Sequence, residues 1–207
     1  YQALYSNVAG SNGVAVGYLS QNNVNNSSVA WDNTNTSVGY YSLVGSGTKA
    51  NNTGLNNVAI GREVLYNNSA AGNNIGIGYL SLFTQTYANG GTAWSTGNVA
   101  VGDSSLYTNN PTSTTNGYKN TAIGSQAMTA NTTGAYNTSV GAFALKSITT
   151  NSNATAVGYK ALTLNTASLN TAVGSEALAT NTSGNGNTAV GGQALKLNTG
   201  NNNTAIG

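Results

Sequence analysis

The apolar positions of the chain follow one short motif that recurs eleven times. Each copy contains Val, Ile or Thr, then a small residue, then Val or Ile, then Gly, as in Val58-Ala59-Ile60-Gly61 and Thr171-Ala172-Val173-Gly174. Alternation of two β-branched residues around a small one predicts a three-residue strand. The glycine predicts a turn at a φ that a Cβ would forbid. The glycines that end the copies are Gly17, Gly39, Gly61, Gly78, Gly102, Gly124, Gly141, Gly158, Gly174, Gly191 and Gly207.

A second half-repeat follows each glycine. In most copies two variable residues precede a small residue and then a Leu or Met, as in Ala144-Leu145 and Ala177-Leu178. An Asn- and Thr-rich segment comes next, such as Asn181-Thr182-Ser183-Gly184, and these residue types suit tight turns. We therefore predict two short strands and two turns in each repeat. Because the apolar positions do not recur every 3.6 residues, a helix is excluded.

Successive glycines of the motif are 16 to 24 residues apart, which is the length of one solenoid coil. The predicted fold class is therefore all-β, a parallel β-solenoid (β-roll) of about 11 coils of 16–24 residues. With coils about 4.8 Å apart, the rod would be on the order of 50 Å long. Residues 1–124 are predicted to form irregular coils with loop insertions, and residues 125–207 regular coils of one continuous solenoid. We expect the chain to be a segment of a longer protein.

The motif also predicts which side chains face the core. We expect the Val or Ile before each glycine to be buried, together with the Leu of the second half-repeat. The small residue, such as Ala172, would then lie on the opposite face and allow close approach of another chain. One coil encloses few side chains, the chain has no Cys, and only 5 % of its residues are charged. We therefore expect a homotrimer, intertwined or side by side, whose axis is parallel to the rod.

Composition excludes most catalytic and binding classes. Without His or Cys there is no basis for a His-containing triad or thiol chemistry. The four acids, Asp32, Glu63, Asp103 and Glu176, fall in different repeats, so a paired-carboxylate site is not expected. We predict that the chain is not an enzyme and holds no cofactor or metal. A net charge of +2 with scattered lysines predicts no nucleic-acid partner, and no apolar run is long enough to enter a membrane or serve as a signal peptide.

The longest repeats contain the candidate binding residues. Excess residues fall at about 22–34, 45–54, 84–96 and 109–118, and loops on a rigid scaffold often carry binding sites. The candidates for receptor contact are Trp31, Tyr87, Trp94 and Tyr118, because aromatic rings among polar residues suit carbohydrate. In the alternative interpretation, the tryptophans cover the edge of the roll or pack between chains.

Tyrosines also recur directly after the motif glycine, at Tyr18, Tyr40, Tyr79 and Tyr159. They could form a row that faces a ligand. The interpretation that we favour is a set of stacked rings on the outer face or at a contact between chains.

Two forms of the repeat resemble known families. Asn56-Asn57-Val58-Ala59-Ile60-Gly61 and the segment from Gly97 to Ser105 resemble the head repeats of YadA-like trimeric autotransporter adhesins, which read Asn-Ser-Val-Ala-Ile-Gly-x-x-Ser. The later form, Asn-Thr-Ala-Val-Gly-x-x-Ala-Leu, resembles repeat arrays of phage-type tail fibres. The resemblance implies a left-handed parallel β-roll with three chains to a rod. The coils are longer than those of the adhesins, and Thr often replaces Val, so viral and bacterial origins both stay open.

These observations predict a structural and adhesive fibre segment. It would be extracellular, on a cell surface or a virion appendage, and would attach to a glycan or protein receptor on a host cell. The alternative is an ice-binding or carbohydrate-binding β-solenoid. Rows of Thr can order water, but we expect the motif threonines, such as Thr171, to point inward with the valines. A polysaccharide-cleaving spike is disfavoured by the small number of acids.

Overall fold

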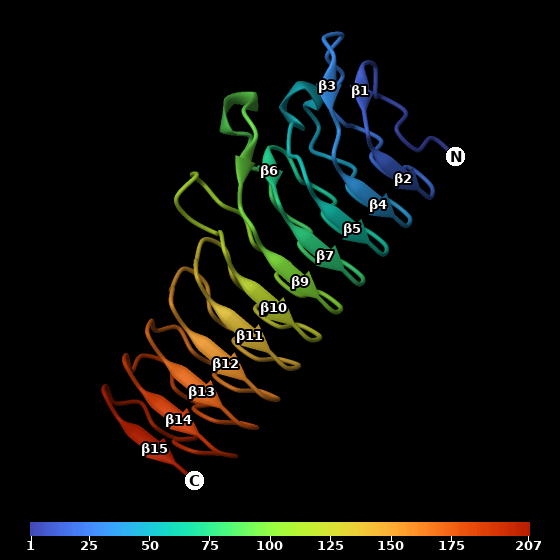
Figure 1. Ribbon diagram of the computed structural model, residues 1–207. Coiled ribbons are helices and arrows are strands. Elements are labelled where there is room, and N and C mark those ends of the chain that lie inside the picture. Colours follow the sequence, from blue (N-terminus) through green and yellow to red (C-terminus); the bar gives the residue numbers. More distant parts are fainter.

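A computed structural model describes residues 1–207, and a single long parallel sheet dominates it (Figure 1). Its eleven strands lie in the order β15-β14-β13-β12-β11-β10-β9-β7-β5-β4-β2, so each strand pairs with the strands of the repeats before and after it. The strands are β2 (Val14–Val16), β4 (Thr36–Val38), β5 (Val58–Ile60), β7 (Ile75–Ile77), β9 (Val99–Val101), β10 (Thr121–Ile123), β11 (Thr138–Val140), β12 (Thr155–Val157), β13 (Thr171–Val173), β14 (Thr188–Val190) and β15 (Thr204–Ile206).

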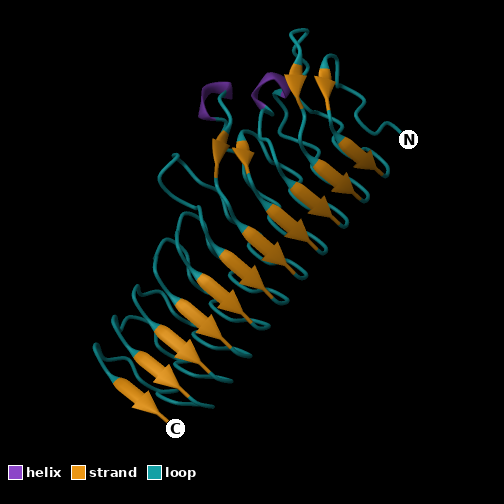
Figure 2. Cartoon of the chain, viewed as in Figure 1, coloured by secondary structure: helices purple, strands orange, loops and turns teal.

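The remaining regular elements are short and lie in the longer repeats. Two small parallel sheets pair β1 (Gly10–Ser11) with β3 (Trp31–Asp32) and β6 (Ala71–Gly72) with β8 (Trp94–Ser95). Two single 3-10 turns, η1 (Lys49–Asn51) and η2 (Asn89–Gly91), are the only helical segments (Figure 2). The prediction of an all-β solenoid with negligible helix is confirmed.

The strands pair without any slip in register. Thr121 lies opposite Thr138, Ala122 opposite Ser139, and Ile123 opposite Val140, and the same correspondence holds along the whole long sheet. Spacings that differ by up to eight residues therefore leave the register unchanged, because loops outside the sheet absorb the extra residues.

The direction in which the strand residues face differs from the prediction. In β13 the central Ala172 is completely buried, whereas Val173 is 37 % exposed. The same pattern recurs in the other strands, so the small residue faces the interior and the two β-branched residues face outward. The expectations that the Val or Ile before each glycine is buried, that the small residue faces another chain, and that the motif threonines point inward were therefore wrong.

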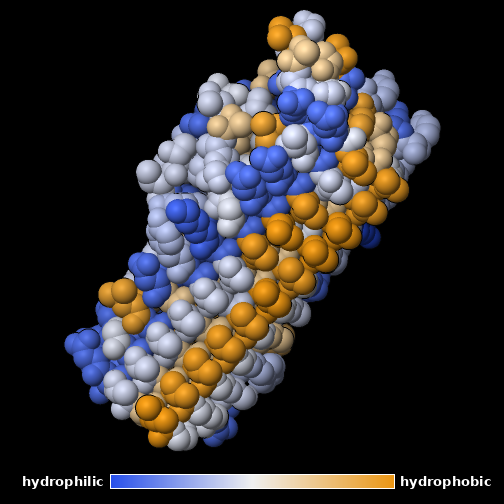
Figure 3. Space-filling model, in the orientation of Figure 1, coloured by the Kyte–Doolittle hydropathy of each residue, from blue (hydrophilic) through white to orange (hydrophobic).

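Two rows of outward side chains result. We call the third-position residues the outer stripe: Val16, Val38, Ile60, Ile77, Val101, Ile123, Val140, Val157, Val173, Val190 and Ile206. The first-position residues form a parallel row, which is entirely Thr from β10 to β15 and which we call the threonine row. Figure 3 shows an orange band along the length of this face. No charged residue belongs to any strand of the long sheet.

The core consists of the small strand residues and the leucines of the second half-repeat. Leu145, Leu162 and Leu178 are completely buried, and they belong to one continuous cluster with Ala156, Ala172 and other small residues. Burial of this leucine position was predicted correctly. The leucine side chain thus fills most of the interior, and only a methyl group from the strand side fits against it.

The second half-repeat is not the second strand that the sequence predicted. Residues two and four positions after each motif glycine have positive φ, for example Glu176 at 57° and Leu178 at 50°. The backbone there nevertheless bonds to the next coil, because Leu162 N donates to Ala177 O at 3.0 Å. Left-handed residues alternate along this side, so it forms a hydrogen-bonded turn without strand geometry.

The motif glycines form a column in which no other residue fits. Their φ values are all strongly positive, with Gly124 at +134°. A Cβ on Gly124 would lie 2.6 Å from the carbonyl of Gly141 in the next coil. The prediction of a glycine-only φ is confirmed, and close stacking of successive coils adds a second reason for glycine.

Buried asparagines form two further columns beside the core. The first column precedes the strands: Asn35, Asn57, Asn74, Asn98, Asn120, Asn137, Asn170, Asn187 and Asn203, with Ala154 in one coil. Each side-chain oxygen in it accepts the backbone N–H of the next member, as from Asn137 N to Asn120 Oδ1 at 3.0 Å. The second column lies seven residues after the glycines, with Asn68, Gln85, Asn109, Asn131, Ile148, Asn165, Asn181 and Asn198. In both columns the side-chain amides take the place of water as hydrogen-bond partners of buried backbone groups.

Breaks in the second column leave unpaired atoms behind. Asn181 Nδ2 donates to Asn165 Oδ1 at 3.2 Å, and Asn131 Nδ2 donates to Asn109 Oδ1 at 2.7 Å. Where the next member is not Asn, the oxygen before it has no donor, as for Asn131 before Ile148. Asn68 Oδ1, before Gln85, is likewise unpaired, and so are both polar atoms of Gln85 itself.

We expect Gln85→Asn to stabilise the chain. The shorter amide would occupy the position of its neighbours and donate to Asn68 Oδ1, which would pair atoms whose desolvation now costs about 1–3 kcal/mol each. Denaturant unfolding should show a higher free energy of unfolding than for the wild type. Gln85→Leu is the matched control, because it imitates Ile148 and removes the unpaired amide without adding a donor. A loss of stability in Gln85→Asn would show that the column does not govern this position.

The inserted residues gather on one side of the rod. The loops that carry β1, β3, β6, β8, η1 and η2 all extend from the edge at which the long-sheet strands begin (Figures 1 and 2). The opposite edge, where the glycine column lies, keeps the same short turn in every coil. Variation in repeat length is thus confined to a single edge.

Candidate functional site

The four candidate receptor residues lie in three separate places along the insertion edge. Trp31 is in β3, Tyr87 and Trp94 belong to the loop that contains η2 and β8, and Tyr118 precedes β10. Trp31 and Trp94 occupy equivalent positions, since each begins a two-residue strand five residues before the next strand of the long sheet. The structure brings only Tyr87 and Trp94 together.

Trp31 packs against the backbone of the preceding coil. A Cβ on Gly10 would lie 2.7 Å from Cε2 of Trp31, so glycine is required beneath the indole ring. The indole Nε1 is buried and has no hydrogen-bond partner. These contacts agree with the interpretation in which Trp31 covers the edge of the roll.

Tyr87 and Trp94 form an aromatic pair next to a shallow hollow. Their rings are perpendicular, with centroids 5.8 Å apart. The hollow, of about 190 Å³, is lined by Leu55, Asn56, Gly72, Asn73, Ala93, Trp94 and Ser95. Asn56 Nδ2 donates to Asn73 Oδ1 at 3.2 Å along its wall. An indole beside two exposed amides offers an apolar surface with hydrogen-bonding groups around it, which suits a sugar ring.

Tyr118 pairs with a residue that the sequence did not single out. Its hydroxyl lies 2.7 Å from that of Tyr136, and the two ring centroids are 5.0 Å apart. The hydrogen bond with Tyr136 is the main cause that raises the pKa of Tyr118 above its usual value, and burial is the second. The Lys119 ammonium lies 5.6 and 5.5 Å from the centroids of these two rings. No hollow lies beside Tyr118, Tyr136 and Lys119. We therefore interpret their contacts as structural links between two adjacent coils and not as a binding site.

Two of the four tyrosines after the motif glycine stack on each other, as we favoured from the sequence. Tyr18 and Tyr40 stack with centroids 5.3 Å apart, and Arg62 lies between Tyr40 and Tyr79. A second stack, formed by Tyr66, Phe83 and Tyr107, lies five residues after the glycines. Parallel stacking covers ring faces that a sugar would otherwise contact. Tyr79 and Tyr159 have no tyrosine at the equivalent position of an adjacent coil, and of these two only Tyr79 lies beside Arg62.

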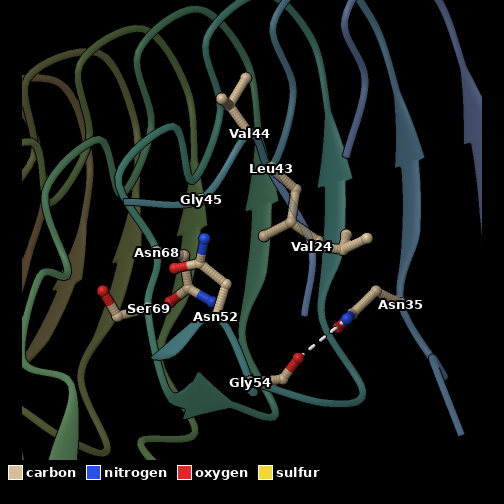
Figure 4. Close-up of a pocket in the computed structure, with 9 residues that line it drawn as sticks. All are labelled: Val24, Asn35, Leu43, Val44, Gly45, Asn52, Gly54, Asn68 and Ser69. Carbon is tan, nitrogen blue, oxygen red and sulfur yellow. Dashed lines mark hydrogen bonds between the residues drawn. The ribbon is translucent and has the colours of Figure 1, made fainter. Parts of the chain in front are cut away.

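A very small cavity lies between the coils of β4 and β5, as Figure 4 shows. Its volume of about 10 Å³ is the size of a single water molecule. Asn35, Asn52 and Asn68 line it with amide groups, and Asn35 Nδ2 donates to Gly54 O at 2.8 Å. The cavity is too small for a ligand, so it is a structural feature of the asparagine columns.

Two of the four acids form ion pairs with cations. Glu63 pairs with Arg62 at 3.0 Å, and Glu176 pairs with Lys196 at 2.6 Å. The hydrogen bond from Lys196 lowers the pKa of Glu176 below its usual value. No three His, Cys, Asp or Glu side chains lie close enough together to hold a metal ion. None of the helical segments has the length and apolar character needed to cross a membrane.

Comparison of the chain with protein-family models, curated proteins and solved structures finds no match in any of the three.

Proposed function

We propose that the chain is the shaft of a trimeric extracellular fibre, of the tail-fibre or surface-adhesin type, that attaches to a host cell surface. The outer stripe is the observation that carries this proposal. It runs the length of the long sheet, contains only Val and Ile, and leaves Val157, Val173 and Val190 each 37 % exposed. A continuous apolar face of this kind marks a surface that another molecule covers.

Copies of the same chain are the proposed partners at this stripe. Because the strands repeat in register, the stripe is straight and matches an identical stripe on a second or third parallel rod. The face carries no charge that would have to be paired across the contact. This contact replaces the one that the sequence predicted, in which the small residues, such as Ala172, faced the neighbouring chain.

The insertion edge is the proposed receptor-binding side. It carries the Tyr87–Trp94 pair and its hollow, and it lies away from the regular turns of the glycine column. The receptor would be a cell-surface glycan or a protein.

Light scattering of the purified chain tests the trimer. We expect a mass near three times the 20.8 kDa of one chain, because burial of the stripe is favourable and no like charges oppose it. A folded monomer of 20.8 kDa would refute the proposal. The chain should be measured without any added trimerisation tag.

A second candidate function is ice binding, and the outward direction of the threonine row favours it. Six consecutive strands present Thr at the same position, about 4.8 Å apart, beside the flat apolar outer stripe. This arrangement requires an uncovered face, so it excludes the trimer contact. We then expect thermal hysteresis in dilute solution, abolished by Thr155→Lys but not by Leu169→Lys. An absence of hysteresis in the folded chain would eliminate this candidate.

A further inference from the structure

The largest hollow of the chain lies outside the predicted sites, in the regular coils. It measures about 510 Å³ and is lined by Phe143, Lys146, Ser147, Tyr159, Lys160, Thr163 and Leu164. These residues come from the second half-repeats of two adjacent coils, which begin at Gly141 and Gly158. The volume falls within the range of about 300–1,000 Å³ that is typical of small-ligand sites.

The sequence explains why a hollow forms at this place. The residues equivalent to Tyr159 in the adjacent coils are Ala142 and Ser175, so no ring stacks on Tyr159. Phe143 meets Tyr159 nearly at a right angle, 80° between planes, with centroids 6.1 Å apart. No ring stacks face to face on this pair, and Tyr159 is 47 % exposed.

Two cations border the hollow, and neither is in a salt bridge. Lys146 Nζ lies 5.2 Å from the Phe143 centroid, and Lys160 Nζ lies 5.1 Å from the Tyr159 centroid. The acid in the next coil, Glu176, accepts hydrogen bonds from Lys196 and from Gln193 Nε2 at 3.1 Å, and Lys160 acts on it through its charge without forming a salt bridge. In a chain with six cations in all, two therefore border one hollow, and neither is in direct contact with a carboxylate.

We propose that this hollow binds an acidic saccharide, in which a carboxylated sugar ring lies against Tyr159. The two ammonium groups would bind the carboxylate, because charge-assisted hydrogen bonds are the strong ones. The Ser147 and Thr163 hydroxyls can exchange hydrogen bonds with sugar hydroxyls. A bare inorganic anion would use the lysines but leave the aromatic rings and Leu164 uncovered, and a neutral sugar would leave both charges unpaired.

The inference deepens the proposed function, because it adds a contact for an acidic surface glycan to the receptor contact proposed at the insertion edge, and it rests on that function for its biological use. A trimer would carry three equal hollows and gain avidity. Each hollow, however, is formed within one chain, so its binding does not require the trimer. Light scattering and saccharide binding can therefore fail independently.

Calorimetric titration of the 207-residue chain with trigalacturonate, a uronic-acid trisaccharide, tests the site. We expect saturable binding to the wild-type chain. The affinity should fall at least about tenfold in the double variant Lys146→Gln/Lys160→Gln and in Tyr159→Ala. Lys119→Gln is the matched control, because Lys119 also lies over two tyrosine rings but borders no hollow, and it should retain wild-type affinity. Circular dichroism should show all variants folded, since the substituted side chains lie at the surface.

Three results would overturn the proposal. The first is no binding of trigalacturonate by the folded wild-type chain. The second is equal affinity for the neutral methyl ester of trigalacturonate, which would show that the lysines do not bind the carboxylate. The third is equal affinity for polyglutamate that Tyr159→Ala leaves unchanged, which would identify a non-specific polyanion contact.

Discussion

Ala172→Leu should destabilise the chain strongly, because the side chain at this position points into the narrow core. Ala172 is completely buried in the cluster that contains Leu162 and Leu178, and its neighbours in the adjacent strands are Ala156 and Ala189. Overpacking of a core typically costs about 1–3 kcal/mol. We expect at least the upper end of that range, since the glycine column holds successive coils at a fixed separation and the sheet cannot move outward.

Thermal and denaturant unfolding measure this effect, with two controls. Ala172→Ser should be nearly neutral, because Ser37 and Ser139 occupy equivalent buried positions. Glu176→Ala should cost well under 1 kcal/mol, since it removes only a partly exposed ion pair with Lys196. Equal melting temperatures for Ala172→Leu and Glu176→Ala would show that the assigned face of the strand is wrong.

Lysine in the outer stripe should dissociate the trimer. Ile123 and Val157 lie in β10 and β12, two strands apart, so lysines at both positions are not direct neighbours. Each side chain is exposed in the single chain, at 40 % and 37 %, and the substitution leaves the core unchanged. In the trimer both ammonium groups would be buried without a partner, which costs several kcal/mol per charge.

For Ile123→Lys/Val157→Lys we expect light scattering to show a mass near 20.8 kDa in place of three times that value. Leu169→Lys is the matched control, because Leu169 is 62 % exposed but lies outside the long sheet, and it should remain trimeric. If the double variant unfolds while the control stays folded, the stripe contact is required for folding as well. An unchanged trimeric mass in the double variant would rule out the stripe as the interface.

The recurring motif was sufficient to predict the strand before each glycine, the parallel pairing, the glycine conformation and the buried leucines, but it wrongly predicted a second strand after the glycine. It did not determine which face of the strand points inward. Successive side chains of a strand point to opposite faces, so Ala172 and Val173 must face opposite sides. The pattern alone is compatible with either of the two facing the core. The volume of the second half-repeat decides the matter, because Leu178 already fills the space that Val173 would need.

One pair of residues carried a signal for the correct direction. In a single repeat the small residue before the leucine is replaced by Val64, and the next strand has Gly76 where other strands have Ala or Ser. A Cβ on Gly76 would lie 2.5 Å from Val64 Cγ1. The larger residue at one position is thus matched by the smaller one at the other, which indicates that both face the same interior.

The candidate binding residues could be predicted only as loop aromatics. Sequence spacing does not show that Tyr118 meets Tyr136 or that Tyr87 meets Trp94, because these contacts depend on how long loops fold back. The hollow at Lys146 and Lys160 was missed for a different reason. Its coils are regular, and the only signal was a tyrosine whose equivalents in the adjacent coils are Ala142 and Ser175.

The confinement of insertions to one edge makes the rod a natural carrier for foreign sequence. The strand register is the same across a 24-residue spacing as across a 16-residue one, so the length of that edge is uncoupled from the rest of the coil. A peptide epitope placed in the exposed turn at Thr112–Thr115 would project sideways while the sheet, the glycine column and the outer stripe stay intact. Grafts in several coils would be spaced along a straight line at multiples of about 4.8 Å, a regular display pitch that compact domains rarely offer.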